Sequence, residues 1–140
     1  MVTSDRVVVH VDGGARGNPG PAAVAAVATD PEGNPLGERS AYIGEATNNV
    51  AEYRAVLLAL ELAHDLGARE IEVVNDSELV ARQIGGEYKV KNAALRELFV
   101  ETMRELREFD RWKVRNVRRE HNVRADELVN EALDERAASG

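Results

Sequence analysis

One stretch of the sequence decides the expected fold: residues 7–14 read Val7-Val8-Val9-His10-Val11-Asp12-Gly13-Gly14. The run of β-branched residues predicts a buried strand, and the two glycines after an acidic residue mark its end. In open α/β sheets, binding sites form outside the carboxyl ends of the strands. Asp12 is therefore the first candidate for a functional residue.

The elements that follow predict an α/β domain. Strands over about 22–29 and 36–43, separated by turns rich in glycine and proline, predict an antiparallel meander. From residue 49 apolar residues recur with a helical period until Gly67, which acts as a stop signal. A strand over 70–74 and a helix from 77 favour a parallel addition to the sheet. A helix over 92–108, a strand over 111–117 and a helix over 123–137 complete one domain, which we place at residues 1–140.

Composition excludes several classes of site. The 140-residue chain has no cysteine, which excludes disulfides and thiolate zinc sites, and its three histidines lack metal-ligand spacing. The longest apolar run, over 22–28, is too short to cross a bilayer, so we expect no membrane partner. Residues 1–6 carry no signal-peptide pattern, which favours a cytoplasmic protein.

The charge is unevenly distributed. A formal net charge of −7 argues against a protein that wraps nucleic acid through bulk electrostatics. One local basic patch exists between residues 111 and 124, where a single acid, Glu120, stands among six cations: Arg111, Lys113, Arg115, Arg118, Arg119 and Arg124. Such a patch is compatible with an enzyme that grips a short stretch of nucleic acid.

Four acidic residues each end a strand pattern or open a helix pattern: Asp12, Glu52, Asp76 and Asp126. Because the topology brings such positions to one edge of the sheet, we expect the four side chains to converge. Carboxylates brought together repel one another unless divalent cations neutralise them, and such sites are typical of enzymes that cut phosphodiesters.

Each acid also has a structural interpretation. Asp12 before two glycines could form a turn, and Glu52, three residues after Asn49, could complete a capping box. Asp76 could cap the helix that follows it, and Asp126 lies in a first helical turn, where negative charge is favoured. Taken together, the four positions favour convergence over coincidence.

The chain resembles the type 1 ribonuclease H family over nearly its whole length. The resemblance is carried by four strings in order: DGGARGNPGP at 12–21, TNNVAEY at 47–53, NDS at 75–77 and NVRAD at 122–126. It implies a ribonuclease H-like α/β fold, with a five-stranded mixed sheet of three antiparallel strands and two parallel additions, and helices on both faces.

The resemblance also implies hydrolysis of the RNA strand of RNA–DNA hybrids with two Mg²⁺ ions, which Mn²⁺ can replace, giving 5′-phosphate and 3′-hydroxyl ends. By the same carry-over Asp12, Glu52, Asp76 and Asp126 are catalytic residues and metal ligands. We expect Asp12 to be the bridging ligand, because it lies on the central strand between the other contributors. Residues expected to bind the hybrid are Asn18, Asn48, Asn49, Lys89 and Lys91.

The sequence departs from the family pattern at three places. Glu78 follows the Asp-Ser pair where many members have glutamine, and the segment 85–92 carries only two lysines instead of a basic helical protrusion. His121 is the only candidate for the histidine that precedes the last helix in many members, and we include it among the catalytic residues, to aid proton transfer or product release. His10 fits a sheet position and His64 a helix surface.

Other functions stay open at this point. The fold group also contains nucleases of DNA junctions and transposase-like strand transferases, against which the short chain and the TNN string at 47–49 argue. A domain that binds nucleic acid without cutting it, or a protein that binds magnesium structurally, would share the fold. We expect a monomer, and whether RNA–RNA duplexes are also cut is undecided by the sequence.

Overall fold

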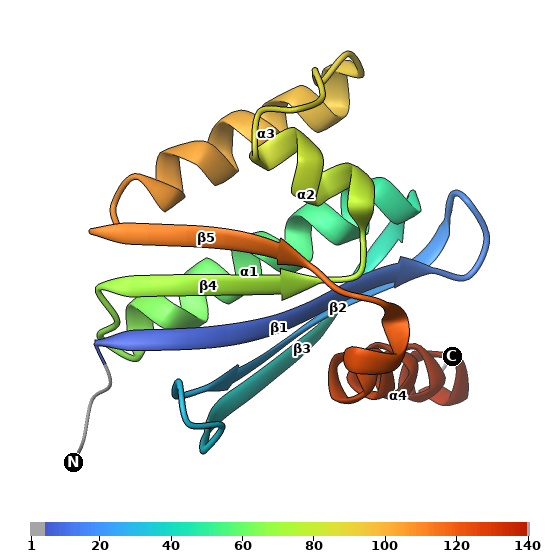
Figure 1. Cartoon of the computed structure of the whole chain (residues 1–140). Coiled ribbons are helices and arrows are strands. Elements are labelled where there is room, and N and C mark those ends of the chain that lie inside the picture. The colour runs from blue at the N-terminus through green and yellow to red at the C-terminus, as the bar shows by residue number, and fades with distance from the viewer. Residues whose placement is uncertain (1–4, 140) are drawn as a thin grey trace.

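In the computed structural model, which describes residues 5–139, five strands form one sheet with the spatial order β3-β2-β1-β4-β5 (Figure 1). Strand β1 pairs antiparallel with β2 and β2 with β3, whereas β4 runs parallel to both β1 and β5. The predicted mixed sheet is therefore confirmed. The strands are β1 Arg6–Ala15, β2 Gly20–Thr29, β3 Pro35–Ala46, β4 Glu70–Asn75 and β5 Arg111–Asn116.

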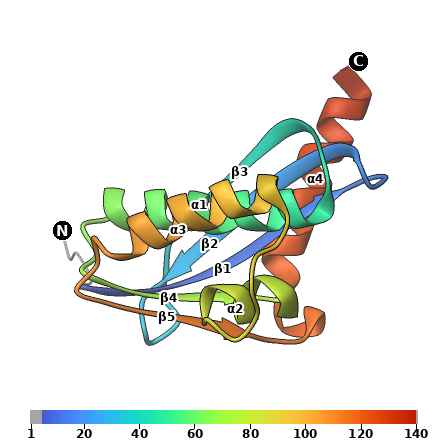
Figure 2. The ribbon, with the colours of Figure 1, turned by 90° about the horizontal axis from the view of Figure 1, so that it is seen from above.

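Helices cover both faces of the sheet, as predicted. In Figure 2, α1 and α3 lie side by side along one face, while α4 lies apart from them. Small residues along β2 let helices approach from both sides: Val24 and Ala26 pack in the cluster that includes α1, and Ala25 packs against α4. The helices are α1 Asn48–Asp65, α2 Glu78–Ile84, α3 Ala93–Leu106 and α4 Val123–Ser139, with a 3-10 turn at Arg119–His121.

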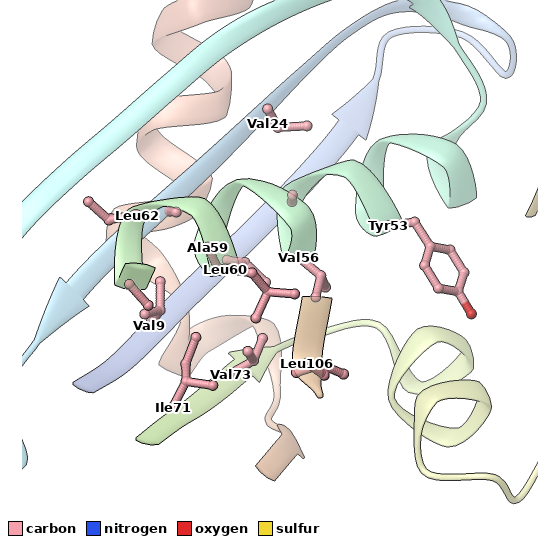
Figure 3. Packing of buried hydrophobic residues seen from close by; sticks show 14 of the residues in the cluster. Val9, Val24, Tyr53, Val56, Ala59, Leu60, Leu62, Ile71, Val73 and Leu106 are labelled. Atoms are coloured by element: carbon pink, nitrogen blue, oxygen red, sulfur yellow. The ribbon is translucent and has the colours of Figure 1, made fainter. Parts of the chain in front are cut away.

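The main core lies between α1 and the sheet. Figure 3 shows Val9 and Val73 from neighbouring strands pointing toward Val56 and Leu60 of α1, with Leu106 of α3 closing the side. Full burial of each large aliphatic side chain contributes roughly 1.5–3 kcal/mol to stability. This packing fixes α1 against β1, and it holds the two elements that carry Asp12 and Glu52 together.

Three predicted boundaries need correction. Strand β1 does not end at Gly13: it continues to Ala15, because both glycines stay paired with Ala23 and Val24 of β2. Strands β2 and β3 likewise extend to Gly20 and Ala46, beyond the predicted bounds. The other predicted elements differ from the observed ones by one or two residues.

Candidate active site

A groove of about 320 Å³ lies where β1 and β4 reach their carboxyl ends beside α4. Figure 1 shows the chain running from the end of β5 past these strand ends into α4. The four predicted acids all line this groove, so the expected convergence of Asp12, Glu52, Asp76 and Asp126 is found in the structure. Arg16, Asn48, Arg119 and Asn130 add polar groups to the same walls.

Asp12 lies in the middle of the groove, on the central strand β1, where it pairs with Ala25 and forms no turn. The close approach of α1 to this point depends on Gly13, because a Cβ there would overlap the backbone carbonyl of Ala51. Burial raises the pKa of Asp12 to about 8, and the charges of Asp76 and Asp126 and a hydrogen bond with Asp126 act in the same direction, whereas Arg119 opposes them.

Glu52 projects from α1 one turn after the helix start. Thr47 caps α1, since its Oγ1 accepts from the Val50 backbone N–H at 3.2 Å. The helix therefore begins one residue earlier than predicted, and Glu52 lies too far along it to complete a capping box. Instead its Oε2 accepts a 2.8 Å hydrogen bond from Ser77 Oγ. Burial raises the pKa of Glu52, although the Ser77 bond lowers it.

Asp76 follows the end of β4 and does not cap the next helix. Ser77 caps α2, accepting from the Val80 N–H, while Asn75 Oδ1 accepts from the Ser77 N–H at 2.8 Å. One carboxylate oxygen of Asp76, Oδ2, is buried without a hydrogen-bond partner. Arg119 Nε lies 3.9 Å from it, too far to donate. Burial raises the pKa of Asp76, whereas Arg119 and a hydrogen bond that the carboxylate accepts from the Asn122 side chain lower it.

Asp126 enters the groove from the first turn of α4, as predicted. Asn122, which is buried, holds the start of this helix: its backbone carbonyl accepts from the Asp126 N–H, and its Nδ2 donates to the Val11 carbonyl at 2.7 Å. Asn122 thus joins the residue before Asp12 to the helix of Asp126. Asn130 Nδ2, one turn later, donates to the Asp126 carbonyl at 3.1 Å.

The donor chemistry of the groove fits a hard divalent cation. Its four carboxylates supply only oxygen donors, the set that Mg²⁺ and Mn²⁺ prefer. Asp76 Oδ2 has no hydrogen-bond partner, and burial, together with the charge of neighbouring carboxylates, raises the pKa values of Asp12, Glu52 and Asp76. A bound cation would stabilise the ionised form of each of these acids. Within residues 5–139, however, no three acidic or histidine side chains already stand in a metal-holding arrangement, so cation binding requires their side chains to turn.

The predicted asparagines lie at the end of the groove formed by β1 and α1. Asn48 lines it, and its Oδ1 accepts from the Ala15 N–H at 2.9 Å. The exposed Asn18 is joined to it, since Asn18 Oδ1 accepts from the Asn48 N–H at 3.1 Å. Asn49 lies next to them in the first turn of α1, partly exposed. The two joined asparagines therefore brace the junction of β1 and α1.

Lys89 and Lys91 are exposed on the segment between α2 and α3 and are not among the groove residues. A buried pair anchors this segment: Tyr53 Oη donates to Gln83 Oε1 at 2.6 Å, and Gln83 Nε2 lies 3.5 Å from the Lys89 carbonyl. Glu78, at the position of the family's glutamine, accepts from Arg82 Nε at 2.8 Å.

His121 does not line the groove of the four acids. It lies with His10 in a neighbouring hollow of about 210 Å³, while Arg119, two residues earlier, reaches the groove. The sequence pattern places Arg119 only in a basic patch, and it includes Ser77 and Asn122 in the family strings without indicating a role for either. The contacts of Arg119, Asn122 and Ser77 join segments that lie far apart in the chain, and such contacts leave no local pattern. The only feature of the sequence that could have drawn attention to these residues is their position beside the acidic motifs.

Comparisons with known proteins agree with this geometry. A family model described as "Reverse transcriptase-like" matches residues 10–132. Ribonuclease HI of Halobacterium salinarum is 45% identical over 130 residues, which is 93% of this chain, and Ribonuclease H of Chromobacterium violaceum is 32% identical over 96% of the chain and 99% of its own length. The solved structure of LC11-RNase H1 in complex with RNA/DNA hybrid superposes with a TM-score of 0.90 at 48% identity, covering 94% of this chain and 99% of that one.

Several relatives are longer than this chain. The chain spans 65% of the length of the Halobacterium protein and 37% of the length of three mycobacterial relatives that are 44% identical to it. In the part of the chain that the structure describes, no helix has the length and apolar character needed to span a bilayer.

Proposed function

This chain belongs to the ribonuclease H family, and on that premise we propose that it hydrolyses the RNA strand of RNA–DNA hybrids, as a metal-dependent endonuclease. The observation that carries the proposal is the groove itself, which four carboxylates line and in which a buried oxygen of Asp76 lacks a hydrogen bond. We propose further that residues 1–140 act as one ribonuclease H domain and as a monomer.

Asp12, Glu52, Asp76 and Asp126 would hold two Mg²⁺ ions, or Mn²⁺ in their place, since all four carboxylates line the groove. Two such ions activate a water molecule and stabilise the leaving oxygen of an in-line displacement. Ser77 fixes the Glu52 carboxylate through its 2.8 Å hydrogen bond. Asn122 fixes the start of α4 beside β1, because its side chain donates to the Val11 carbonyl.

The bond changes are those of phosphodiester hydrolysis. A water oxygen forms a bond to phosphorus, the bond from phosphorus to the 3′ oxygen breaks, and a proton ends on that oxygen. The products carry 5′-phosphate and 3′-hydroxyl ends. His121, exposed beside the groove, is our candidate for aiding proton transfer or product release.

Substrate contacts are proposed on both sides of the groove. The amide groups of Asn18, Asn48 and Asn49 suit 2′-hydroxyls and base edges in a minor groove, which favours RNA without demanding a base sequence. Lys89 and Lys91 would contact the phosphate backbone from the segment after α2.

The test is cleavage of an end-labelled RNA–DNA hybrid with Mg²⁺, with Mn²⁺ and with a chelator, beside DNA duplex and RNA duplex controls. We expect metal-dependent cutting confined to the RNA strand, with 5′-phosphate ends, and its loss in Asp12→Asn. Binding of the hybrid without cutting under either metal would overturn the proposal in favour of a non-catalytic domain. Cutting of the RNA duplex would widen the substrate class without changing the reaction.

A further inference from the structure

The basic patch seen in the sequence lies along the edge strand β5 and the segment that follows it. We define the basic strip as Arg111, Lys113, Arg115, Arg118 and Arg119. Strand β5 is an edge strand, and its residues alternate, so that Trp112 and Val114 pack against the core while the three basic side chains between and beside them are exposed. Beyond β5, the line continues through the two arginines of the strip that precede α4.

The strip leads into the groove. The backbone N–H of Val117 donates to the Asn75 carbonyl at 2.8 Å, which brings the end of β5 beside the strand that precedes Asp76. Arg119, the last member of the strip, itself lines the groove and lies 3.9 Å from Asp76 Oδ2. A polyanion held along the strip would therefore run continuously into the cluster of carboxylates.

The cations of the strip are held loosely. The side chains of Arg111 and Arg118 are each 85% exposed, and their distances to Glu70 and Glu120 are 3.6 and 3.9 Å. Exposed pairs of this kind contribute about 0–1 kcal/mol, so a phosphate can replace the carboxylate at little cost. Only Arg115 has a short pair, at 2.9 Å to Glu72, and within residues 5–139 Lys113 has no ion pair.

The spacing of the strip suits a phosphate backbone. Alternate residues on one face of a strand lie about 6.6 Å apart, so the three cations on β5 form a regular row. The nearby aromatic side chain, Trp112, packs inward and offers no platform on which bases could stack. The row can therefore bind phosphates and is unsuited to reading bases.

The net charge of the whole molecule disfavours nucleic acid. The whole chain carries a net charge of −7, and the surface between α1 and α3 gathers Glu61, Glu101, Glu105 and Glu108. A duplex that approaches the groove from the strip avoids that negative surface. On these grounds, and resting on the proposed function, we propose that the basic strip binds the phosphate backbone of the hybrid, with Arg111, Lys113, Arg115 and Arg118 doing so beyond the catalytic groove.

The double variant Arg111→Gln with Lys113→Gln tests this inference. Arg104→Gln with Arg107→Gln is the matched control, because it removes the same charge from exposed positions at the end of α3. Both are made in an Asp76→Asn background, so that the hybrid is not cut, and binding of a 30-base-pair hybrid is followed by fluorescence anisotropy between about 50 and 200 mM salt.

We expect the strip variant to lower the slope of log affinity against log salt by about two, one for each cation that no longer binds a phosphate. Between about 50 and 200 mM salt, the Asp76→Asn protein without further substitutions would then lose about tenfold more affinity for the hybrid than the strip variant does. The control should keep the full slope, and a hybrid of about 10 base pairs should show a smaller difference because less of it reaches the strip.

An unchanged slope in the strip variant overturns the inference. If, in addition, the strip binds polyglutamate while the salt dependence of hybrid binding stays unchanged in the strip variant, the surface is assigned to an acidic protein partner instead. The outcome is separable from the proposed function. If the wild-type protein cuts no hybrid but the slope still depends on the strip, the proposed activity fails and the binding surface stands.

Discussion

Two acidic regions of this molecule have similar size and similar numbers of carboxylates, yet they differ in how those carboxylates are held. The groove of about 320 Å³ gathers Asp12 of β1, Glu52 of α1, Asp126 of α4 and Asp76, which follows β4. The hollow of about 340 Å³ between α1 and α3 gathers four glutamates and His64 from two helix surfaces and their ends.

The difference lies in burial and in backbone anchoring. The groove acids are partly buried, and each is placed by a strand end or a helix start whose backbone is fixed by contacts such as Asn122 to Val11. The glutamates of the hollow are mostly exposed on flexible side chains, and Glu61 is already paired with Arg39 at 3.4 Å. A count of acids therefore does not define a site, whereas buried and unpartnered oxygens do.

The largest expected effect is on cleavage. Asp76→Asn should lower the rate of hybrid cleavage by at least about a thousandfold, because it removes a ligand whose charge stabilisation amounts to several kcal/mol. Glu105→Gln, in the hollow, should keep the wild-type rate. Single-turnover cleavage of a labelled hybrid measures both, and comparable losses in the two variants would erase the distinction between the regions.

The next effect is on the scaffold of the groove. Gly13→Ala should lower the free energy of unfolding by about 3 kcal/mol, because its Cβ would meet the rigid backbone at Ala51. Gly14→Ala is the matched control: the nearest atom to its Cβ is Val129 Cγ1 at 3.9 Å, so we expect a change below about 1 kcal/mol. Urea unfolding of both variants tests this, and equal stabilities would show that β1 and α1 have room to separate.

The third prediction concerns pH. The folded-state pKa of Asp12, about 8, exceeds its ordinary value of 3.8, so between these values the folded state holds a proton that the unfolded chain has released. In chelator, the free energy of unfolding should therefore fall as pH rises from about 4 to 8. Asp12→Asn should remove the contribution of Asp12 to this pH dependence. The free energy of unfolding should then fall less steeply with pH, because only the raised pKa values of Glu52 and Asp76 still contribute.

Thermal or urea unfolding across this pH range, in chelator throughout, makes the measurement. A wild-type stability that rises toward pH 8, or an Asp12→Asn variant with the wild-type slope, would contradict the assignment of a buried, protonated Asp12.

The smallest effect is expected in the hollow. Glu101 and Glu105 are four residues apart on α3 and repel each other, so Glu101→Gln should stabilise the protein by about 0.2–0.5 kcal/mol at low salt. The gain should vanish at about 1 M salt, where exposed charges are screened. A larger change, or one that persists in high salt, would mean that these acids are more strongly coupled than their exposure implies.

The four acids can be predicted from the sequence because each has a local signature: a strand end, a helix start or a first turn. The contacts that bring the four acids together into a site cannot be predicted from the sequence. Asn122 reaches Val11 across 111 positions, and the approach of Ala51 to Gly13 depends on how α1 packs, and neither leaves a periodic pattern. The glycines after Asp12 wrongly indicate a strand end because pairing with β2 overrides their low strand preference.

The most direct test of the account is a calorimetric titration of the protein with Mn²⁺ at pH 8, comparing wild type, Asp12→Asn and the double variant Glu101→Gln with Glu105→Gln. We expect saturable binding in the wild type, its loss in Asp12→Asn, and unchanged binding in the double variant. Binding that survives Asp12→Asn, or that disappears with the two glutamates of the hollow, would contradict the claim that the groove of the four acids is the metal site.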